Sequence, residues 1–272
     1  MSVLDVTREA SVTTALLNNP PANVLTIDLI NEVNHFLASV DNEQDTKVVV
    51  FKSANPLFFS AHFDLNLING TAEGHAGCMA FSQMIKSLKQ LKPLSIAVVD
   101  GCARGGGDEF VMACDLSFGT ENAVFAQPEI GVNIPTGGQG GVQYARRMGR
   151  SKALQSLLTG RDHSAQEAER LNIITQYVPK ADMDSFLDSQ LAVINSLDRR
   201  DIAMYKDIVA TSIMDEDAGV ELELKYFLDR AGEEKSQTIF KAFLKSGGQT
   251  EREATDFMGI FADTVAELSR HS

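Results

Sequence analysis

The chain has 272 residues, 44% of them hydrophobic and 22% charged, which suits one large or two small domains at about 150 residues each and excludes a disordered chain or a disulfide-stapled miniprotein. Its 24 basic and 37 acidic residues give a formal net charge of −13, which repels a phosphate backbone and argues against a nucleic-acid partner. Its three cysteines, an odd number, predict reduced thiols.

The N-terminus lacks the pattern of a secretion signal, because Asp5 and Glu9 stand where a basic start and an apolar run are needed. The strongest apolar runs, at 48–51 and 96–99, have the length of a strand and not that of a membrane span. We therefore expect a cytoplasmic protein with no membrane partner.

The first part of the chain alternates short strands with amphipathic helices. β-branched segments at 12–17 and 47–51 predict strands. Between them, apolar residues at helical spacing predict a helix over 25–40, with Thr26 or Asp28 as its N-cap.

The alternation continues through a second helix and strand. An apolar stripe predicts a helix over 78–91 that Pro93 ends, followed by a strand at 94–99. Further short elements are a helix over 108–114 and strands at 116–119 and 123–125. Such alternation predicts a layered α/β core.

From about residue 151 the pattern becomes mostly helical. Helices are predicted over 151–158, 165–171, 181–197, 202–212, 219–228, 239–244 and 250–268, with one strand at 173–178. We expect an α/β core over 1–195 and a helical oligomerisation region over 196–272.

Two of the C-terminal helices are apolar on more than one face. The residues concerned are Val220, Leu222, Leu224, Tyr226, Phe227 and Leu228 in the first, and Phe257, Met258, Ile260 and Phe261 in the second. Such helices must be covered on several faces. The pattern favours assembly with further copies of the chain over a monomer that folds these helices on its own core.

A glycine-rich turn at 105–107 follows a predicted strand and leads into a helix. Glycines let the backbone approach a ligand closely, and a helix N-terminus offers free N–H groups. The turn lacks the Lys-Ser/Thr ending of a phosphate-binding loop and the spacing of a dinucleotide fingerprint. It is either an anion-accepting turn or simply a tight one.

Two carboxylates accompany this turn. Glu109 lies directly after the glycines, and Glu129 comes twenty residues later in a loop marked by Pro128 and Gly131. They suit a paired acid and base. The alternative is a helix first-turn residue and a solvated loop charge, and the residues alone leave both interpretations open.

A third tract, residues 56–65, directly follows the strand at 47–51. The three tracts together resemble the enoyl-CoA hydratase/isomerase (crotonase) superfamily, whose pattern has F-x-A-G-A-D-L, then K-P-x-I-A-A-V-x-G-x-A-x-G-G-G-x-E-L, then F-x-Q-P-E. The matching residues are Lys92, Pro93, Gly101, Ala103, Gly105, Gly106, Gly107, Glu109, Phe125, Gln127, Pro128 and Glu129. Agreement extends over roughly residues 10–180.

The resemblance implies a spiral of β-β-α turns, a helical C-terminal region that forms a homotrimer or a dimer of trimers, and an acyl-CoA thioester as substrate. It implies an oxyanion hole made by the N–H groups of Phe63 and Gly106, and a water molecule held by Glu109 and Glu129. Coenzyme A is then part of the substrate, and no separate cofactor is expected.

The remaining residues that the resemblance places at the substrate are Ala61, His62, Asp64, Gly105, Gly107, Gly137 and Gly138. Asp64 is expected to cap or brace the oxyanion loop. The sequence departs from the family at His62, where a glycine is usual, and at Phe63, where a small residue is usual. His62 is thus a candidate to line the pocket or simply to pack. The glycines at 137–141 are also rearranged.

Retention of both glutamates favours hydration or its reverse. The alternatives are an isomerase, decarboxylase or carbon–carbon lyase of the same superfamily, and, from another class, a non-catalytic subunit that binds CoA thioesters.

Other candidates are weaker. Cys102 has no nearby histidine in the sequence and is expected to be a buried thiol. Arg104, Lys241 and Lys245 are candidates for CoA phosphates, though each is more typical of a surface cation. The histidines show no metal-ligand spacing, so no metal is expected.

Overall fold

The computed structural model describes residues 2–68, 71–214, 233–247, 249, 252 and 256–270. The chain divides into two compact units, Met1–Ala203 and Met204–Ser272, so the division at residue 195 stays a prediction. The predicted helix at 219–228 and the start of the one at 250–268 lie outside the described residues. Within the described ranges, no helix combines the length and hydrophobicity that crossing a membrane requires.

A six-stranded sheet forms the centre of the first unit, in the order β1-β2-β3-β5-β7-β10. β1 and β2 form an antiparallel hairpin, and the pairs from β2 to β10 are parallel. The strands are β1 (Leu4–Glu9), β2 (Val12–Leu17), β3 (Val48–Ser53), β5 (Leu94–Val99), β7 (Leu116–Gly119) and β10 (Gln176–Tyr177). Parallel strands need long crossovers, which here carry the helices.

A second, four-stranded sheet consists of β4 (Phe58–Ser60), β6 (Cys102–Arg104), β8 (Val124–Ala126) and β9 (His163–Ser164). β3 of the large sheet is followed by β4, β5 by β6, and β7 by β8. The chain then enters α2 (Ala72–Gln90), α3 (Gly106–Ala113) and α4 (Gly140–Met148), respectively. These repeated β-β-α turns confirm the expected spiral.

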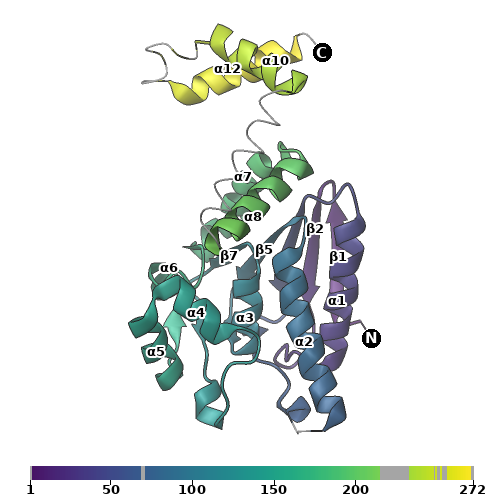
Figure 1. Ribbon diagram of the computed structural model, residues 1–272, viewed down its shortest axis with the longest axis vertical. Coiled ribbons are helices and arrows are strands. Elements are labelled where there is room, and N and C mark those ends of the chain that lie inside the picture. Colours follow the sequence, from purple (N-terminus) through teal and green to yellow (C-terminus); the bar gives the residue numbers. More distant parts are fainter. Residues whose placement is uncertain are drawn as a thin grey trace. The chain divides into compact units, whose positions relative to one another are not determined.

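Helices α1 (Ile27–Asn42), α2 and α3 lie side by side across one face of the large sheet (Figure 1). The remaining helices of this unit are α5 (Arg150–Thr159), α6 (Ala165–Arg170), α7 (Met183–Asn195) and the start of α8 (Arg199–Met214). Of the two predicted N-cap candidates, Thr26 and Asp28, Thr26 caps α1, accepting a hydrogen bond from the Leu29 N–H. Thr71 caps α2 in the same way, so α2 begins before the predicted residue 78.

The alternation of side chains along β3 shows why the sheet is buried on both faces. Val49 and Phe51 join the large core beneath the helices, whereas Val48 and Val50 join a smaller core on the opposite face. That smaller core includes Leu187 of α7. The sheet is therefore a fixed platform on which the turns after β3, β5 and β7 are placed.

Several elements differ from the sequence-based predictions. β1, β4, β6 and α4 were not predicted, and the strand expected at 173–178 is reduced to β10. β4 and β6 are only three residues long, so they show no measurable periodicity. Ile173 and Ile174 are buried in the core without belonging to a strand.

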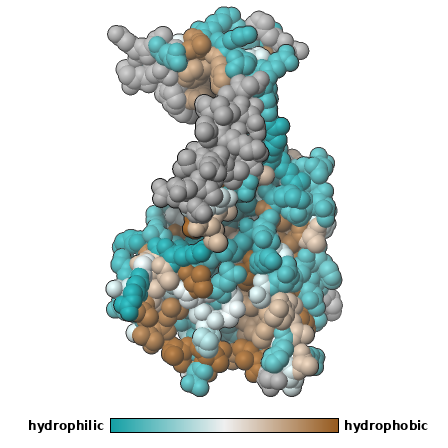
Figure 2. Space-filling model, in the orientation of Figure 1, coloured by the Kyte–Doolittle hydropathy of each residue, from teal (hydrophilic) through white to brown (hydrophobic). Residues whose placement is uncertain are grey.

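The second unit contains α10 (Glu234–Lys245) and α12 (Phe257–Ser269). They contact each other, and the rings of Phe243 and Phe261 are 5.5 Å apart. In the first unit, Figure 2 shows apolar surface over the region that carries α4 and α5 in Figure 1. The exposed apolar residues of α4, α5 and the segment preceding them are Ile130, Val132, Val142, Leu154 and Leu158.

Candidate active site

The glycine-rich turn brings the start of α3 against the chain at 60–63. Gly105 has a φ of +50°, a conformation that glycine adopts readily. A Cβ on Gly106 would lie 2.9 Å from the Phe63 nitrogen, and one on Gly107 would lie 2.2 Å from the Ser60 carbonyl oxygen. Backbone therefore meets backbone at this point, which explains why side chains are absent from these positions.

The Phe63 N–H lies at this contact and is held there by a one-residue β-bridge. Leu25 and Phe63 form a parallel bridge, in which the Leu25 N–H donates to the His62 carbonyl at 2.9 Å and the Asp64 N–H donates to Leu25 at 3.2 Å. In a parallel bridge one residue bonds the two neighbours of its partner, here His62 and Asp64, and the partner itself, Phe63, forms no hydrogen bond across the bridge. The Phe63 N–H thus points away from Leu25, on the side where α3 begins.

Gly106 supplies a second N–H at the same place. It is the first residue of α3, and N–H groups of a first turn have no acceptor within their helix. The positive end of the helix dipole reinforces this donor. Two backbone N–H groups from segments forty residues apart in the sequence therefore lie beside each other.

The Phe63 side chain does not fill this place. It is 9% exposed and packs against Phe81 of α2, with the ring centroids 5.1 Å apart. The bulky residue at a position where the family has a small one is thus accommodated in the core.

The loop around Phe63 is braced from both sides. The Ala61 N–H donates to the Ala22 carbonyl at 3.0 Å. The Asp64 carboxylate caps the 3₁₀ helix Leu65–Leu67, accepting from the Asn66 N–H at 2.9 Å. Asp64 therefore caps this loop, as expected.

Glu109 is a buried carboxyl, 3% exposed. Its Oε1 accepts hydrogen bonds from the N–H groups of Gly138 and Gly140, each at 2.7 Å. Burial raises the pKa of Glu109 to about 7; the Gly140 and Gly138 N–H groups oppose this increase and the charge of Glu129 adds to it. At neutral pH this carboxyl can therefore either hold or release a proton.

Glu129 begins the 3₁₀ helix Glu129–Val132. Burial raises its pKa, whereas its own backbone N–H and the charge of His62 lower it. Its Oε1 lies 2.7 Å from the position of a Cβ on Gly105. Its Oε2 is buried, and no described residue donates a hydrogen bond to it. A buried acceptor in this state suits a water molecule or a substrate group.

A buried polar cluster behind Glu109 was not predicted. The Asp108 Oδ2 atom accepts from the Gln127 amide at 2.9 Å and from the Tyr144 hydroxyl at 2.8 Å, and all three side chains are buried. Burial raises the pKa of Asp108 to about 7. Because Tyr144 belongs to α4, whose first residue, Gly140, donates to Glu109, the cluster ties α4 to α3. Gly140 was also missed; the run of glycines was its only signal.

Other predicted residues do not join this arrangement. A Cβ on Gly137 would meet nothing within 4 Å among the described residues. Arg104 forms a two-pronged pair with Asp162 at 2.8 and 2.7 Å, and Lys245 pairs with Glu267. Cys102 is half-buried, rather than buried as expected.

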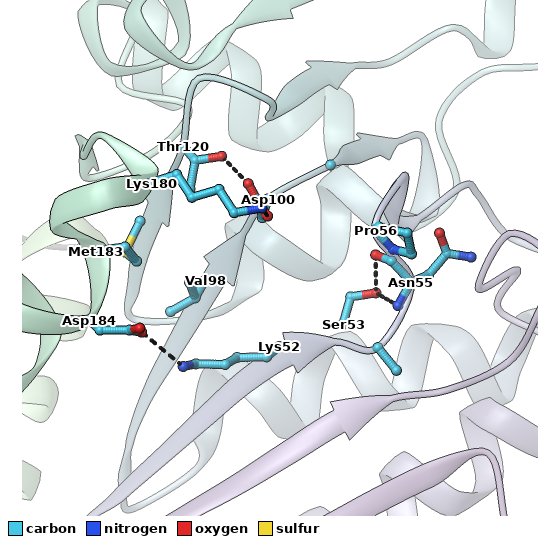
Figure 3. Close-up of a pocket in the computed structure, with 12 residues that line it drawn as sticks. Lys52, Ser53, Asn55, Pro56, Val98, Asp100, Thr120, Lys180, Met183 and Asp184 are labelled. Carbon is cyan, nitrogen blue, oxygen red and sulfur yellow. Dashed lines mark hydrogen bonds and ion pairs between the residues drawn. The ribbon is translucent and has the colours of Figure 1, made fainter.

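A pocket of about 380 Å³ lies elsewhere in this unit, at the ends of β3 and β5 next to α7 (Figure 3). Two lysines line it, and both are paired: Lys180 with Asp100 at 2.6 Å and Lys52 with Asp184 at 3.9 Å. None of the predicted site residues lines this pocket.

Comparisons with known proteins find relatives named as a hydratase and a dehydratase of CoA thioesters. The chain is 29% identical to the short-chain-enoyl-CoA hydratase of Clostridium acetobutylicum, over 65% of this chain and 69% of that protein. It is also 29% identical to the carnitinyl-CoA dehydratase of Proteus mirabilis, over 82% of this chain and 88% of that protein.

Solved structures show the same fold. An enoyl-CoA hydratase from Bacillus anthracis, 25% identical, matches with a TM-score of 0.82 over 89% of this chain and 96% of that one. DspI of Pseudomonas aeruginosa, 22% identical, matches in fold with a TM-score of 0.83 over 90% of this chain and 95% of that one. A family model described as enoyl-CoA hydratase/isomerase matches residues 7–250. With most of its length matched by that model, the chain belongs to the enoyl-CoA hydratase/isomerase family.

Proposed function

We propose that the protein is a hydratase-type lyase that adds water to, or removes it from, the acyl group of a CoA thioester. The observation that carries this proposal is a buried carboxyl, Glu109, together with the half-buried Glu129, whose Oε2 atom is buried, beside the turn where Gly106 meets the Phe63 N–H. The relatives named as a hydratase and a dehydratase support the same reaction class.

The two N–H groups stabilise the charge that the reaction creates. The thioester carbonyl lies between the Phe63 and Gly106 N–H groups and becomes an enolate oxygen in the transition state. Donors already aimed at that oxygen cost no reorganisation when the charge develops. The α3 dipole adds a favourable potential at Gly106.

The two glutamates divide the proton transfers. One of them, as a carboxylate, takes a proton from water, the resulting hydroxide oxygen bonds to C3 of the enoyl group, and the C2=C3 electron pair moves into the enolate. The other, as a protonated carboxyl, then gives a proton to C2, and the carbonyl re-forms. Burial raises the pKa of both groups, that of Glu109 to about 7, so that protonated and ionised carboxyls are both available near neutral pH.

The test is turnover of crotonyl-CoA and of longer trans-2-enoyl-CoAs, followed by loss of the conjugated enoyl absorbance. We expect hydration of at least one chain length and an increase in thermal stability with CoA thioesters. Absence of turnover together with absence of any thermal shift would overturn the proposal. A shift without turnover would identify the non-catalytic alternative.

A further inference from the structure

Asp108 is a fully buried carboxyl that the hydration mechanism does not use. It occupies the variable position of the related G-G-G-x-E-L pattern, directly before Glu109. Taking a carboxyl out of water is unfavourable, and an apolar side chain of similar size would be buried here without that cost. The hydrogen bonds of Asp108 show what the carboxyl contributes instead.

One oxygen of Asp108 accepts hydrogen bonds from two different segments of the chain. The Gln127 amide donates to Oδ2 at 2.9 Å, and the Tyr144 hydroxyl donates to the same atom at 2.8 Å. Asp108 lies in the first turn of α3, whereas Gln127 directly follows β8 and Tyr144 lies in α4. A single acceptor therefore connects α3 to both sides of the loop that joins β8 to α4.

The first of these hydrogen bonds holds the start of that loop. Gln127 is buried, and only Pro128, whose ring restricts φ, separates it from Glu129 in the chain. The Gln127 amide also donates to the Gly105 carbonyl at 3.4 Å. The start of the loop is therefore attached both to α3 and to the glycine turn that precedes α3, two residues ahead of Glu129.

The second hydrogen bond holds the end of the loop. Tyr144 lies about one helical turn after Gly140, the first residue of α4, whose N–H donates to Glu109 at 2.7 Å. A Cβ on Gly140 would clash with the Gln127 Oε1 atom, so the Gln127 amide packs directly against the backbone at Gly140. The two ends of the loop therefore meet at the Gln127 side chain, and Asp108 is hydrogen-bonded to both.

We propose that Asp108 is a positioning residue of the active site, whose Oδ2 atom sets the positions of Gly140 and Glu129 relative to α3 by holding both ends of the loop between β8 and α4. The inference rests on the proposed hydration, because it concerns how the groups of that reaction are placed. A displacement of about 1 Å at a reacting group can cost about 10²-fold in rate. Asp108 acts through Gln127 and Tyr144 and is assigned no proton transfer.

The test compares variants that remove these hydrogen bonds with one that keeps them. Tyr144→Phe removes one hydroxyl and keeps the ring in the core, and Asp108→Leu removes the shared acceptor at similar size. We expect each to lower kcat for enoyl-CoA hydration by about tenfold with KM within about twofold, because the two N–H groups that bind the thioester stay in place. Asp108→Asn keeps an oxygen acceptor and should retain kcat to within about threefold. Tyr177→Phe is the matched control, at a half-buried tyrosine whose hydroxyl has no hydrogen-bond partner among the described residues.

Wild-type kcat in both Tyr144→Phe and Asp108→Leu, or an equal loss in Asp108→Asn and Asp108→Leu, would overturn the inference while leaving hydration intact.

A second measurement does not depend on turnover. Hydrogen–deuterium exchange followed by mass spectrometry reports the opening of the hydrogen bonds that the Gly138 and Gly140 N–H groups donate to Glu109. In Tyr144→Phe we expect peptides covering 137–144 to exchange about tenfold faster, with peptides of α1 unchanged. Unchanged exchange over 137–144, or equal acceleration in α1 from general destabilisation, would overturn the inference even where the proposed reaction fails.

Discussion

The two units of the chain treat their apolar side chains differently. In Met1–Ala203 the sheet has a hydrophobic core on each face. No described residue of Met204–Ser272 belongs to either core. As on α4 and α5 of the first unit, its helices leave large apolar residues exposed, namely Tyr205, Val209, Ile213, Phe240, Leu244, Phe261 and Val265. On α8, Tyr205, Val209 and Ile213 recur every four residues and so lie on one face.

From this difference we infer that the first unit carries the proposed chemistry and the second the proposed assembly. Every residue assigned to the proposed site lies in the first unit, where burial changes the pKa of its carboxyls. The second unit has apolar faces without such chemistry, which is typical of a surface that another chain covers. The following predictions test that separation, in order of decreasing expected effect on the site.

The largest effect is expected from replacing either glutamate. Glu109→Gln and Glu129→Gln each remove a proton-transfer group without changing side-chain size, so hydration should fall by about 10²–10⁴-fold. Measured kcat with crotonyl-CoA checks this. If only Glu129→Gln lowers turnover, isomerisation is the better assignment. If both variants kept the wild-type kcat, the chemistry would lie elsewhere.

A smaller loss is expected from Gly106→Ala. The added methyl would lie 2.9 Å from the Phe63 nitrogen and force the two N–H groups apart. Removal of one oxyanion donor typically costs about 10²–10³-fold in kcat. Gly131→Ala is the control, because no atom of the described residues lies within 4 Å of the methyl it adds. Equal kcat values for the two variants would contradict the proposed oxyanion hole.

A stability effect is expected from Asp108→Asn. The pKa of Asp108 in the folded chain, about 7, lies above its ordinary value of 3.8, so the folded state binds more protons between those values. Stability must therefore fall as pH rises through this interval, by up to about 1.4 kcal/mol per pH unit for one group.

Asp108→Asn removes this group, so its free energy of unfolding should decrease less from pH 5 to pH 8 than that of the wild type. Urea unfolding at several pH values measures the difference. Asp45→Asn, at an exposed position, should leave the wild-type slope unchanged. Parallel curves for Asp108→Asn and the wild type would show that Asp108 is charged throughout.

The smallest effect on the site is expected from the second unit. We propose that the chain forms a homotrimer or a dimer of trimers through its C-terminal region. Light scattering coupled to size exclusion should then give a mass of three or six chains, and Val209→Lys should reduce it by charging the apolar face of α8. Asp207→Lys, on the opposite face, is the control. A wild-type mass near 29.6 kDa would refute the trimer.

The fold was predictable where an apolar repeat extended over a long segment or where a capping or helix-ending residue marked its boundary. The stripe under α1, the Thr26 cap and the strand at 94–99 were all predicted at or near their observed bounds. The short strands β4 and β6 were not, because three residues have no period and their partners are distant in sequence.

The candidate site divides in the same way. The sequence by itself determined which groups are available: two glutamates, a glycine turn before a helix, and a histidine where the related pattern has glycine. Only the tertiary structure decided that Phe63 turns into the core, that Gly138 and Gly140 hold Glu109, and that a buried aspartate lies behind it. These depend on contacts between distant segments, and burial, which sets the pKa of Glu109 and Glu129, exists only once those segments meet.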